Sequence, residues 1–241
     1  MITQKGKGLL VVGKKKSNIF MRVLSALVIG PVFIISIIYI KSLFYILMLL
    51  IAVGMLYEWY QMTKPSITKS SFLYGLFGLI IIPIPIISLV IIATEDKNRW
   101  LLLLYFTIIW SVDIFAMIGG KNIGGIKLAP KISPNKTWSG LITGVLASGV
   151  AAFLLSLLPG FDLPTYYLLN KRHLIIAAFC LALIAQMSDL FISYFKRKFA
   201  IKDSGTIIPG HGGVLDRFDS IILTAPILFL LLKYYELSIS Y

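Results

Sequence analysis

Residues 173–219 read HLIIAAFCLALIAQMSDLFISYFKRKFAIKDSGTIIPGHGGVLDRFD, an apolar run that passes directly into a strongly polar segment. The polar part, 193–219, holds five cations, three carboxylates, four glycines and one histidine. Cations attract phosphate, carboxylates bind divalent metals, and glycines let backbone N–H groups approach a ligand closely. This combination predicts nucleotide or pyrophosphate chemistry at a membrane surface.

The composition of the whole chain predicts a membrane protein with several spans. Its 241 residues are 58% hydrophobic and 14% charged, and the mean hydropathy is +0.90. Soluble globular proteins have about 25% charged residues. Several apolar runs reach the ~20 residues that cross the hydrocarbon core of a bilayer. The single cysteine, Cys180, lies inside one of these runs, where a small buried side chain is expected and a disulfide is not.

The net charge of +13 is explained by membrane topology. Lys and Arg collect in the cytoplasmic connectors of inner-membrane proteins. Nucleic-acid binding would need a basic soluble domain, and the sequence shows none, so nucleic acid is not an expected partner. Residues 1–22 carry several cations and no acid, which predicts a cytoplasmic anchor beside anionic lipid headgroups.

Seven apolar segments are expected to form transmembrane helices, which makes the fold class an all-α polytopic integral membrane protein. They comprise residues 23–40, 43–60, 72–93, 100–118, 138–158, 173–192 and 218–235. With the N-terminus inside, the strongly positive connectors all lie on the cytoplasmic side, as the positive-inside rule requires. An eight-helix alternative would split 72–93 at Pro83-Ile84-Pro85. Because that split would invert every later connector, we expect one helix kinked by its prolines.

The expected organisation has three parts. Residues 1–22 form the basic cytoplasmic segment, residues 23–93 the N-terminal transmembrane helices, and residues 100–241 the catalytic transmembrane region. The positive connectors 119–137 and 193–217 place the site of the catalytic region on the cytoplasmic face of the cell inner (plasma) membrane. The oligomeric state is left open, with a homodimer as one option.

Asp189 is the acid that most needs a partner, because it lies one to two turns inside the end of an apolar helix. An unpaired carboxylate within a span costs roughly 2.5–3.5 kcal/mol. At helical spacing Asp189 shares one face with Ser193, Lys196 and Arg197. This face is therefore expected to point into a polar site.

Asp216 and Asp219 are spaced i, i+3 at the start of the last span and also share a helical face. One interpretation is that Asp189 and Asp216 meet across two helices and hold Mg²⁺, which is usually bound by one or two carboxylates plus substrate phosphates. In the structural alternative, Asp189 pairs with Arg217 and Asp216 only caps the last helix. The flexible run IPGHGG, residues 208–213, favours the metal interpretation, because a plain connector does not need so many glycines.

A second polar cluster extends from Asp113 to Gly140 and contains GGKNIGG at 119–125 and ISPNKTW at 132–138. The spacing does not fit a Walker loop. Its glycines and lysines could cradle phosphate as a backbone nest, or the cluster could be a positive connector only. Asp113 lies deep in the fourth span and is expected to face the polar interior of the site. His211, set among glycines, is expected to contact a ligand.

These segments together resemble the phosphatidate cytidylyltransferase (CDP-diacylglycerol synthase) family. The family signature is Ser-x-apolar-Lys-Arg-x4-Lys-Asp-x-small-x2-apolar-Pro-x-His-Gly-Gly-apolar-x-Asp-Arg-apolar-Asp, and 193–219 meets it at every fixed position. The segment SPNKTW at 133–138 is similar to the second motif of the family. The chain departs from the usual family residues, which are Gly, Glu and Glu, at Ser188, Ile192 and Ser139.

The resemblance implies that phosphatidate and CTP are converted to CDP-diacylglycerol and pyrophosphate, with Mg²⁺ as cofactor and a second cation left open. It implies that the metal ligands are Asp189 and Asp216, with Asp219 auxiliary. The catalytic residues that it implies are Lys196, Arg197, Lys202, Asp203, His211 and Arg217. The substrate-binding residues that it implies are Ser193, Gly212, Gly213, Lys136 and Asp113.

Two other functions remain open at this point. A transporter would have acids near the membrane midplane and repeat symmetry, whereas these carboxylates cluster at the cytoplasmic ends of the helices. A related CTP-dependent membrane enzyme, such as a polyprenol kinase, would share the run His-Gly-Gly-x-x-Asp-Arg loosely. The full signature favours the cytidylyltransferase.

Overall fold

The computed structural model describes residues 27–64, 69–163, 171–208 and 212–239. The expected anchor at 1–22 lies outside these residues. After an apolar helix at Leu27–Ile38, the elements follow in chain order. They are α2 (Lys41–Thr63), α3 (Lys69–Ile81), α4 (Pro83–Thr94), η1 (Asp96–Asn98), α5 (Arg99–Asn122), β1 (Lys127–Ala129), β2 (Ser133–Thr137), α6 (Trp138–Leu155), α7 (Lys171–Lys198), α8 (Leu215–Phe218) and α9 (Ile221–Ile239).

The apolar helices fall on all seven segments that hydropathy predicted. Among the described residues, five are long and apolar enough to cross a membrane: Lys41–Thr63, Ser71–Thr94, Asp96–Asn122, Trp138–Leu155 and Lys171–Lys198. The two helices at Leu27–Ile38 and Ile221–Tyr235 are apolar but shorter. The predominance of apolar helices confirms a helical membrane protein.

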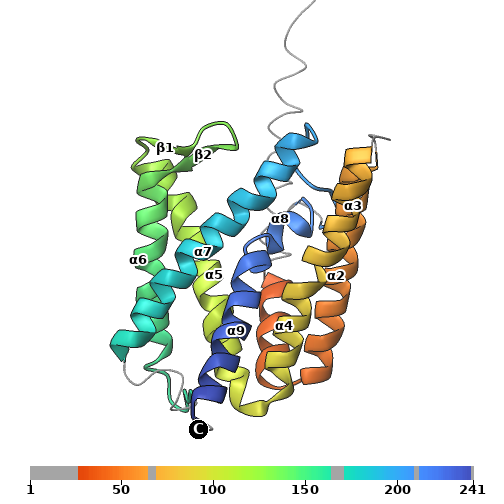
Figure 1. Cartoon of the computed structure of the whole chain (residues 1–241). Helices are drawn as coiled ribbons and strands as arrows, with labels where there is room; N and C mark the ends of the chain where they lie inside the picture. The colour runs from red at the N-terminus through yellow and green to blue at the C-terminus, as the bar shows by residue number, and fades with distance from the viewer. Residues whose placement is uncertain (1–26, 65–68, 164–170, 209–211, 240–241) are drawn as a thin grey trace, which may run out of the picture.

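The third apolar segment breaks where its prolines predicted a kink. Helix α3 ends at Ile81 and α4 begins at Pro83, so that only Ile82 separates them. Proline has no backbone N–H to continue the hydrogen-bond ladder of the preceding turn. Figure 1 shows α3 above α4 in the same column of the bundle, as expected for one kinked helix.

The connector 119–137 corrects the expectation of a purely helical chain. Its second half forms an antiparallel hairpin in which Lys127 pairs with Thr137 and Ala129 with Ser133. The hairpin runs straight into α6, because the Thr137 side chain accepts a hydrogen bond from the Gly140 N–H at 3.1 Å and caps that helix. Figure 1 shows the hairpin at the same end of the bundle as the C-terminal end of α7.

Helices α5 and α6 approach each other closely through glycines on α6. A Cβ atom built on Gly144 would lie 2.7 Å from the Val112 carbonyl oxygen, and one on Gly140 would lie 2.6 Å from the Ala116 carbonyl oxygen. Small residues that allow such backbone contact are common where membrane helices pack. The contact fixes the cluster 113–140, which joins the two helices, at one end of the bundle.

We expect Gly144→Ala to lower the thermal stability, because its methyl group would press on backbone and overpacking costs about 1–3 kcal/mol. Gly30→Ala is the matched control, since no atom lies within 4 Å of a Cβ built at that helical position. The measurement is the temperature at which half of the purified protein stays monodisperse in detergent. Equal losses in both variants would contradict the close contact between α5 and α6.

Candidate active site

A cavity of about 780 Å³ lies at the end of the bundle that carries the hairpin. Its wall is built by α5, β2, the start of α6, α7 and the segment around α8. Five carboxylates from three separate parts of the chain line it: Asp113, Asp189, Asp203, Asp216 and Asp219. Lys136 and Lys196 lie among them on the same wall. The fold therefore gathers acids that lie far apart in the sequence around one space.

Asp189, on α7, is held by the hairpin and by its own helix. Lys136 Nζ lies 2.5 Å from Asp189 Oδ2, and Ser193 Oγ donates to Asp189 Oδ1 at 3.2 Å. Lys136 also donates to Gln186 Oε1 at 2.8 Å. The cationic partner of Asp189 in this ion pair is thus Lys136, whereas the structural alternative had named Arg217.

Asp113, on α5, receives its hydrogen bonds from neutral groups. Gln186 Nε2 donates to Asp113 Oδ1 at 3.2 Å, and Ser220 Oγ donates to Asp113 Oδ2 at 3.4 Å. Gln186 therefore connects Asp113 to Lys136. Asp113 lies on the wall of the cavity.

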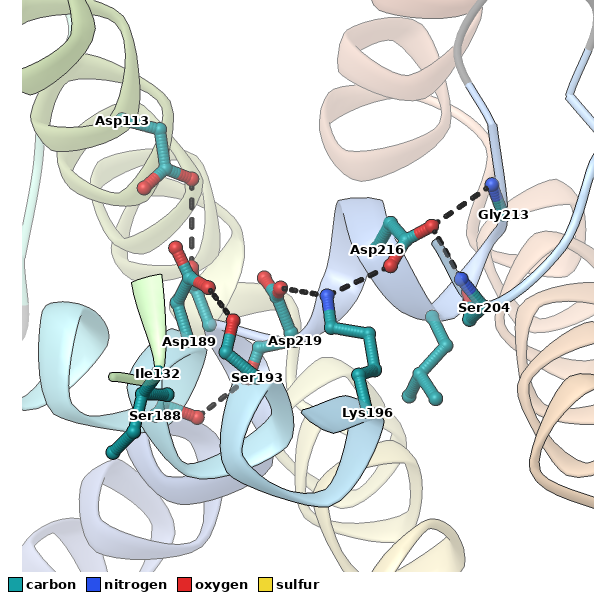
Figure 2. Close-up of polar contacts among 12 residues, drawn as sticks. Asp113, Ile132, Ser188, Asp189, Ser193, Lys196, Ser204, Gly213, Asp216 and Asp219 are labelled. Atoms are coloured by element: carbon teal, nitrogen blue, oxygen red, sulfur yellow. Dashed lines mark hydrogen bonds and ion pairs between the residues drawn. The ribbon is translucent and has the colours of Figure 1, made fainter. Parts of the chain in front are cut away.

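Asp216 is almost enclosed by protein groups. Lys196 Nζ donates to Asp216 Oδ1 at 2.8 Å, and the Ser204 and Gly213 N–H groups donate to Asp216 Oδ2 at 2.9 and 3.2 Å. Lys196 Nζ also lies 3.9 Å from Asp219 Oδ2. Figure 2 shows the ammonium group between the two carboxylates. Lys196 thereby links α7 to the segment that begins α9.

The donor chemistry of this wall fits a hard divalent cation. Carboxylate oxygens are the ligands that Mg²⁺ prefers, and Mg²⁺ needs only one or two of them when substrate phosphates supply the rest. Asp189 and Asp216 each contact a different lysine. Within the described ranges, no group of three or more His, Cys, Asp or Glu side chains is arranged to hold a metal. The residues thus fit a metal that arrives with a phosphate ligand better than a protein-only cage.

A second cavity of about 530 Å³ adjoins the first, because Asn135, Lys196 and Asp203 line both. Its other polar lining residues are Lys131, Ser133, Ser193, Arg197 and Lys202. Arg197 is fixed there, since Nε donates to the Ile132 carbonyl and one terminal nitrogen donates to the Ile201 carbonyl, both at 3.0 Å. The first cavity is lined by carboxylates and cations together and the second mainly by cations, which suits a metal-bound polyphosphate.

Comparison with known proteins agrees with this chemistry. The sequence model of the cytidylyltransferase family matches residues 63–235. The chain belongs to the cytidylyltransferase family. It is 62% identical to the phosphatidate cytidylyltransferase of Rickettsia bellii (strain RML369-C) over 229 residues, which is 95% of this chain and 97% of that protein.

Two further relatives carry the same name. The phosphatidate cytidylyltransferase of Rickettsia conorii (strain ATCC VR-613 / Malish 7) is 63% identical over 234 residues, 97% of this chain and 100% of that protein. The one from Brucella abortus biovar 1 (strain 9-941) is 43% identical over 129 residues, 52% of this chain and 44% of that protein. The resemblance stated from the sequence signature is thereby confirmed.

The structure gathers most of the predicted site residues of this cytidylyltransferase chain. The first cavity collects Asp113, Lys136, Asp189, Lys196, Asp203, Asp216, Arg217 and Asp219. The second collects Ser193, Arg197 and Lys202 together with Lys196 and Asp203. His211 lies outside the described residues. The roles assigned to these side chains remain predictions.

The two signature glycines have backbone functions in the fold. Gly212 has φ +89°, a conformation that suits glycine, and exchanges backbone hydrogen bonds with Ile208 that close the loop. Gly213 donates its N–H to Asp216. A Cβ atom on Gly213 would lie 2.1 Å from Ser204 Oγ, so no larger residue fits there.

Two of the residues that depart from the usual family residues, Ser188 and Ser139, form hydrogen bonds through their hydroxyl groups. Ser188 Oγ donates to the Asp219 carbonyl at 2.5 Å and accepts from the Leu223 N–H at 3.1 Å, which ties α7 to the start of α9. Ser139 Oγ donates to the Gly124 carbonyl and links α6 to the preceding connector. Both hydroxyls bind nearby backbone groups.

Sequence reasoning missed Gln186 and Glu58. Gln186 connects Lys136 with Asp113, and Glu58 binds the loop that leads into α8. A signal existed for Glu58, because a carboxylate near the end of an apolar helix carries the same insertion cost that singled out Asp189. For Gln186 the sequence offered no comparable signal, since an amide within a span is not charged.

We expect Lys136→Met to loosen the hairpin, because it removes the ammonium group that contacts Asp189 and Gln186 on α7. A partly exposed pair of this kind contributes about 1 kcal/mol, which corresponds to roughly fivefold faster opening. The opening of the hairpin is measured by hydrogen–deuterium exchange of the backbone amides of residues 127–137. The matched control is Lys131→Met, an exposed lysine in the turn of the same hairpin. Unchanged exchange in Lys136→Met would show that the bridge does not hold the hairpin.

Proposed function

We propose that this chain is a CTP:phosphatidate cytidylyltransferase that forms CDP-diacylglycerol and pyrophosphate in phospholipid biosynthesis. The observation that carries the proposal is the pair of adjoining cavities at one end of a bundle of apolar helices, the first lined by carboxylates and cations together and the second mainly by cations. Relatives that match 95–97% of the chain are named for this activity, which makes the proposal specific to CTP and phosphatidate.

In the proposed reaction, a phosphate oxygen of phosphatidate attacks the α-phosphorus of CTP. The new P–O bond forms as the bond between the α-phosphorus and its bridging oxygen breaks, and pyrophosphate leaves. Both reactants are anions, so the site must neutralise charge and hold the groups in line. Little covalent chemistry is required of the protein.

The cations of the two cavities are suited to this neutralisation. Lys196 faces both cavities, so its ammonium group can contact phosphate oxygens on either side. Arg197, fixed by two carbonyl groups, and the exposed Lys202 extend the positive surface toward solvent. We assign these residues to binding the CTP phosphates. We assign Arg217, which lines the first cavity, to attracting the lipid phosphate.

Mg²⁺ is the proposed cofactor. Asp189 and Asp216 would hold it, with Asp219 auxiliary, and the bound ion would supply charge neutralisation at the triphosphate. The lysines that contact these carboxylates keep the acids compensated and oriented in the wall of the cavity. Ser193 and Lys136 each contact a different oxygen of Asp189, which orients its carboxylate.

We further propose seven spans with the N-terminus inside and the site on the cytoplasmic face of the inner membrane. The supporting observation is charge: the connector 119–137 carries four lysines and no acid, and it lies at the end of the bundle that holds the cavities. The positive-inside rule places such a connector in the cytoplasm. CTP is then accessible from the cytoplasm, and phosphatidate can enter sideways from the inner leaflet.

Purified protein incubated with phosphatidate, Mg²⁺ and CTP labelled at the α-phosphate is expected to give labelled CDP-diacylglycerol. Asp189→Asn and Asp216→Asn should each lower turnover at least ~100-fold, the scale for losing an electrostatic contact to the transition state. Asp162→Asn, an exposed acid in the connector 159–172, is the matched control and should retain activity.

The position of the label separates the rival functions. Transfer of label from the γ-phosphate of CTP to lipid would identify a lipid kinase instead. Solute flux in proteoliposomes without CTP turnover would identify a transporter. Near-normal turnover of either Asp→Asn variant at low Mg²⁺ concentration would overturn the metal assignment.

The orientation is checked by cysteine labelling in a Cys180→Ser background. Lys131→Cys, in the hairpin turn, is expected to react with an impermeant maleimide only in inside-out vesicles. Asp162→Cys, at the other end of the bundle, should react only in right-side-out vesicles. Reaction of both positions from the same side would contradict the seven-span topology.

A further inference from the structure

Glu58 is a buried carboxylate near the C-terminal end of α2, before the first residue matched by the family model. Its side chain is 1% exposed. A charged group at such a place is costly unless it is paired or hydrogen-bonded. The partners of Glu58 come from a segment about 150 positions later in the chain.

Both carboxylate oxygens of Glu58 accept hydrogen bonds from the loop between α7 and α8 together with the first residue of α8. Oε1 accepts from the Val214 N–H at 2.9 Å. Oε2 accepts from the Leu215 N–H at 2.8 Å and from Ser204 Oγ at 2.7 Å. Glu58 therefore holds the two described arms of the loop, 204–208 and 212–215, on α2 at the same time.

The same two arms hold Asp216. Ser204 donates its hydroxyl to Glu58 and its N–H to Asp216, and Gly213, whose N–H also donates to Asp216, directly precedes Val214. Two carboxylates thus bind the same loop. Because Asp216 lines the first cavity and Glu58 belongs to α2, a shift of the loop away from Glu58 would move the donors that orient Asp216.

Two glycines of the loop are required by the volume of the Glu58 carboxylate. A Cβ atom on Gly205 would lie 2.5 Å from Glu58 Oε1, and one on Gly213 would lie 2.5 Å from Glu58 Oε2. A Cβ atom built on Gly54, one turn earlier on α2, would lie 3.0 Å from Val214 Cγ2. The loop and α2 are therefore fitted to each other at close range.

We infer that Glu58 is a positioning residue for the cytidylyl transfer proposed above. It acts through the loop: it fixes Ser204, Gly213 and Val214, and these groups set the orientation of Asp216 and of the Lys196 ammonium group bound to it. The inference rests on the proposed function for its kinetic part only. Its structural part, that Glu58 anchors the loop, can be tested without any substrate.

Glu58→Gln is the main test, because an amide has one accepting oxygen and cannot serve all three donors. Hydrogen–deuterium exchange of 204–208 and 212–215, measured without CTP or Mg²⁺, is expected to become about tenfold faster. The kcat should fall about 10- to 100-fold, the range for losing one or two hydrogen bonds to a charged acceptor, with less than a threefold change in KM for CTP. A lower kcat with a nearly unchanged KM indicates misplaced reacting groups, because loss of substrate affinity would raise KM instead.

Thr63→Val is the matched control on the same helix. Thr63 is buried, and its hydroxyl donates to the Trp59 and Tyr60 carbonyls within α2, so this change removes buried hydrogen bonds without touching the loop. It should leave exchange of the loop and kcat unchanged. If Glu58→Gln does not fold, Ser204→Ala removes only one of the three hydrogen bonds to Glu58 and tests the same contact.

The outcomes separate this inference from the proposed function. Unchanged exchange of the loop in Glu58→Gln, or an equal effect in Thr63→Val, would overturn the anchoring role. Faster exchange with an unchanged kcat would overturn the positioning role. A wild-type protein that transfers no cytidylyl group would overturn the proposed function, while the exchange measurements would still decide whether Glu58 anchors the loop.

Discussion

Each carboxylate at the polar end of these apolar helices needs a partner that compensates its charge. The contacts with these partners hold the end of the bundle together. Asp189 binds a lysine from the hairpin, Asp216 binds a lysine from α7, and Glu58 binds backbone N–H groups of the loop. Every one of these contacts joins two segments that are distant in sequence. The cost of an uncompensated charge in an apolar environment therefore holds the site together as well as supplying its chemistry.

The carboxylates of this end of the bundle are compensated in two ways. Glu58 is satisfied by groups of the protein alone and is shielded from solvent. Asp189 and Asp216 are compensated by Lys136 and Lys196, whose ammonium groups also face the first cavity. A lysine is a mobile point charge on a flexible chain. In the proposed reaction, such lysines would turn toward incoming phosphates while the acids accept a cation in their place.

Much of the fold could be predicted from the sequence. Apolar runs fix which segments become helices, because a backbone in hydrocarbon must satisfy its own hydrogen bonds. The prolines at 83 and 85 marked the break between α3 and α4. The hairpin at 127–137 was not predicted, because it is short, polar and rich in lysine, and it lacks the alternating apolar pattern that signals a strand.

For the site, the sequence determined which residue types were available and that 193–219 belonged to a phosphate-handling family. Spacing along α7 correctly placed Asp189 and Ser193 on one face, because helical geometry is local. Only the tertiary structure decided the partners: that Lys136 reaches Asp189, that Lys196 reaches Asp216, and that Glu58 supports the loop. These contacts depend on how helices pack across the bundle, and hydropathy and spacing within one segment carry no information about that packing.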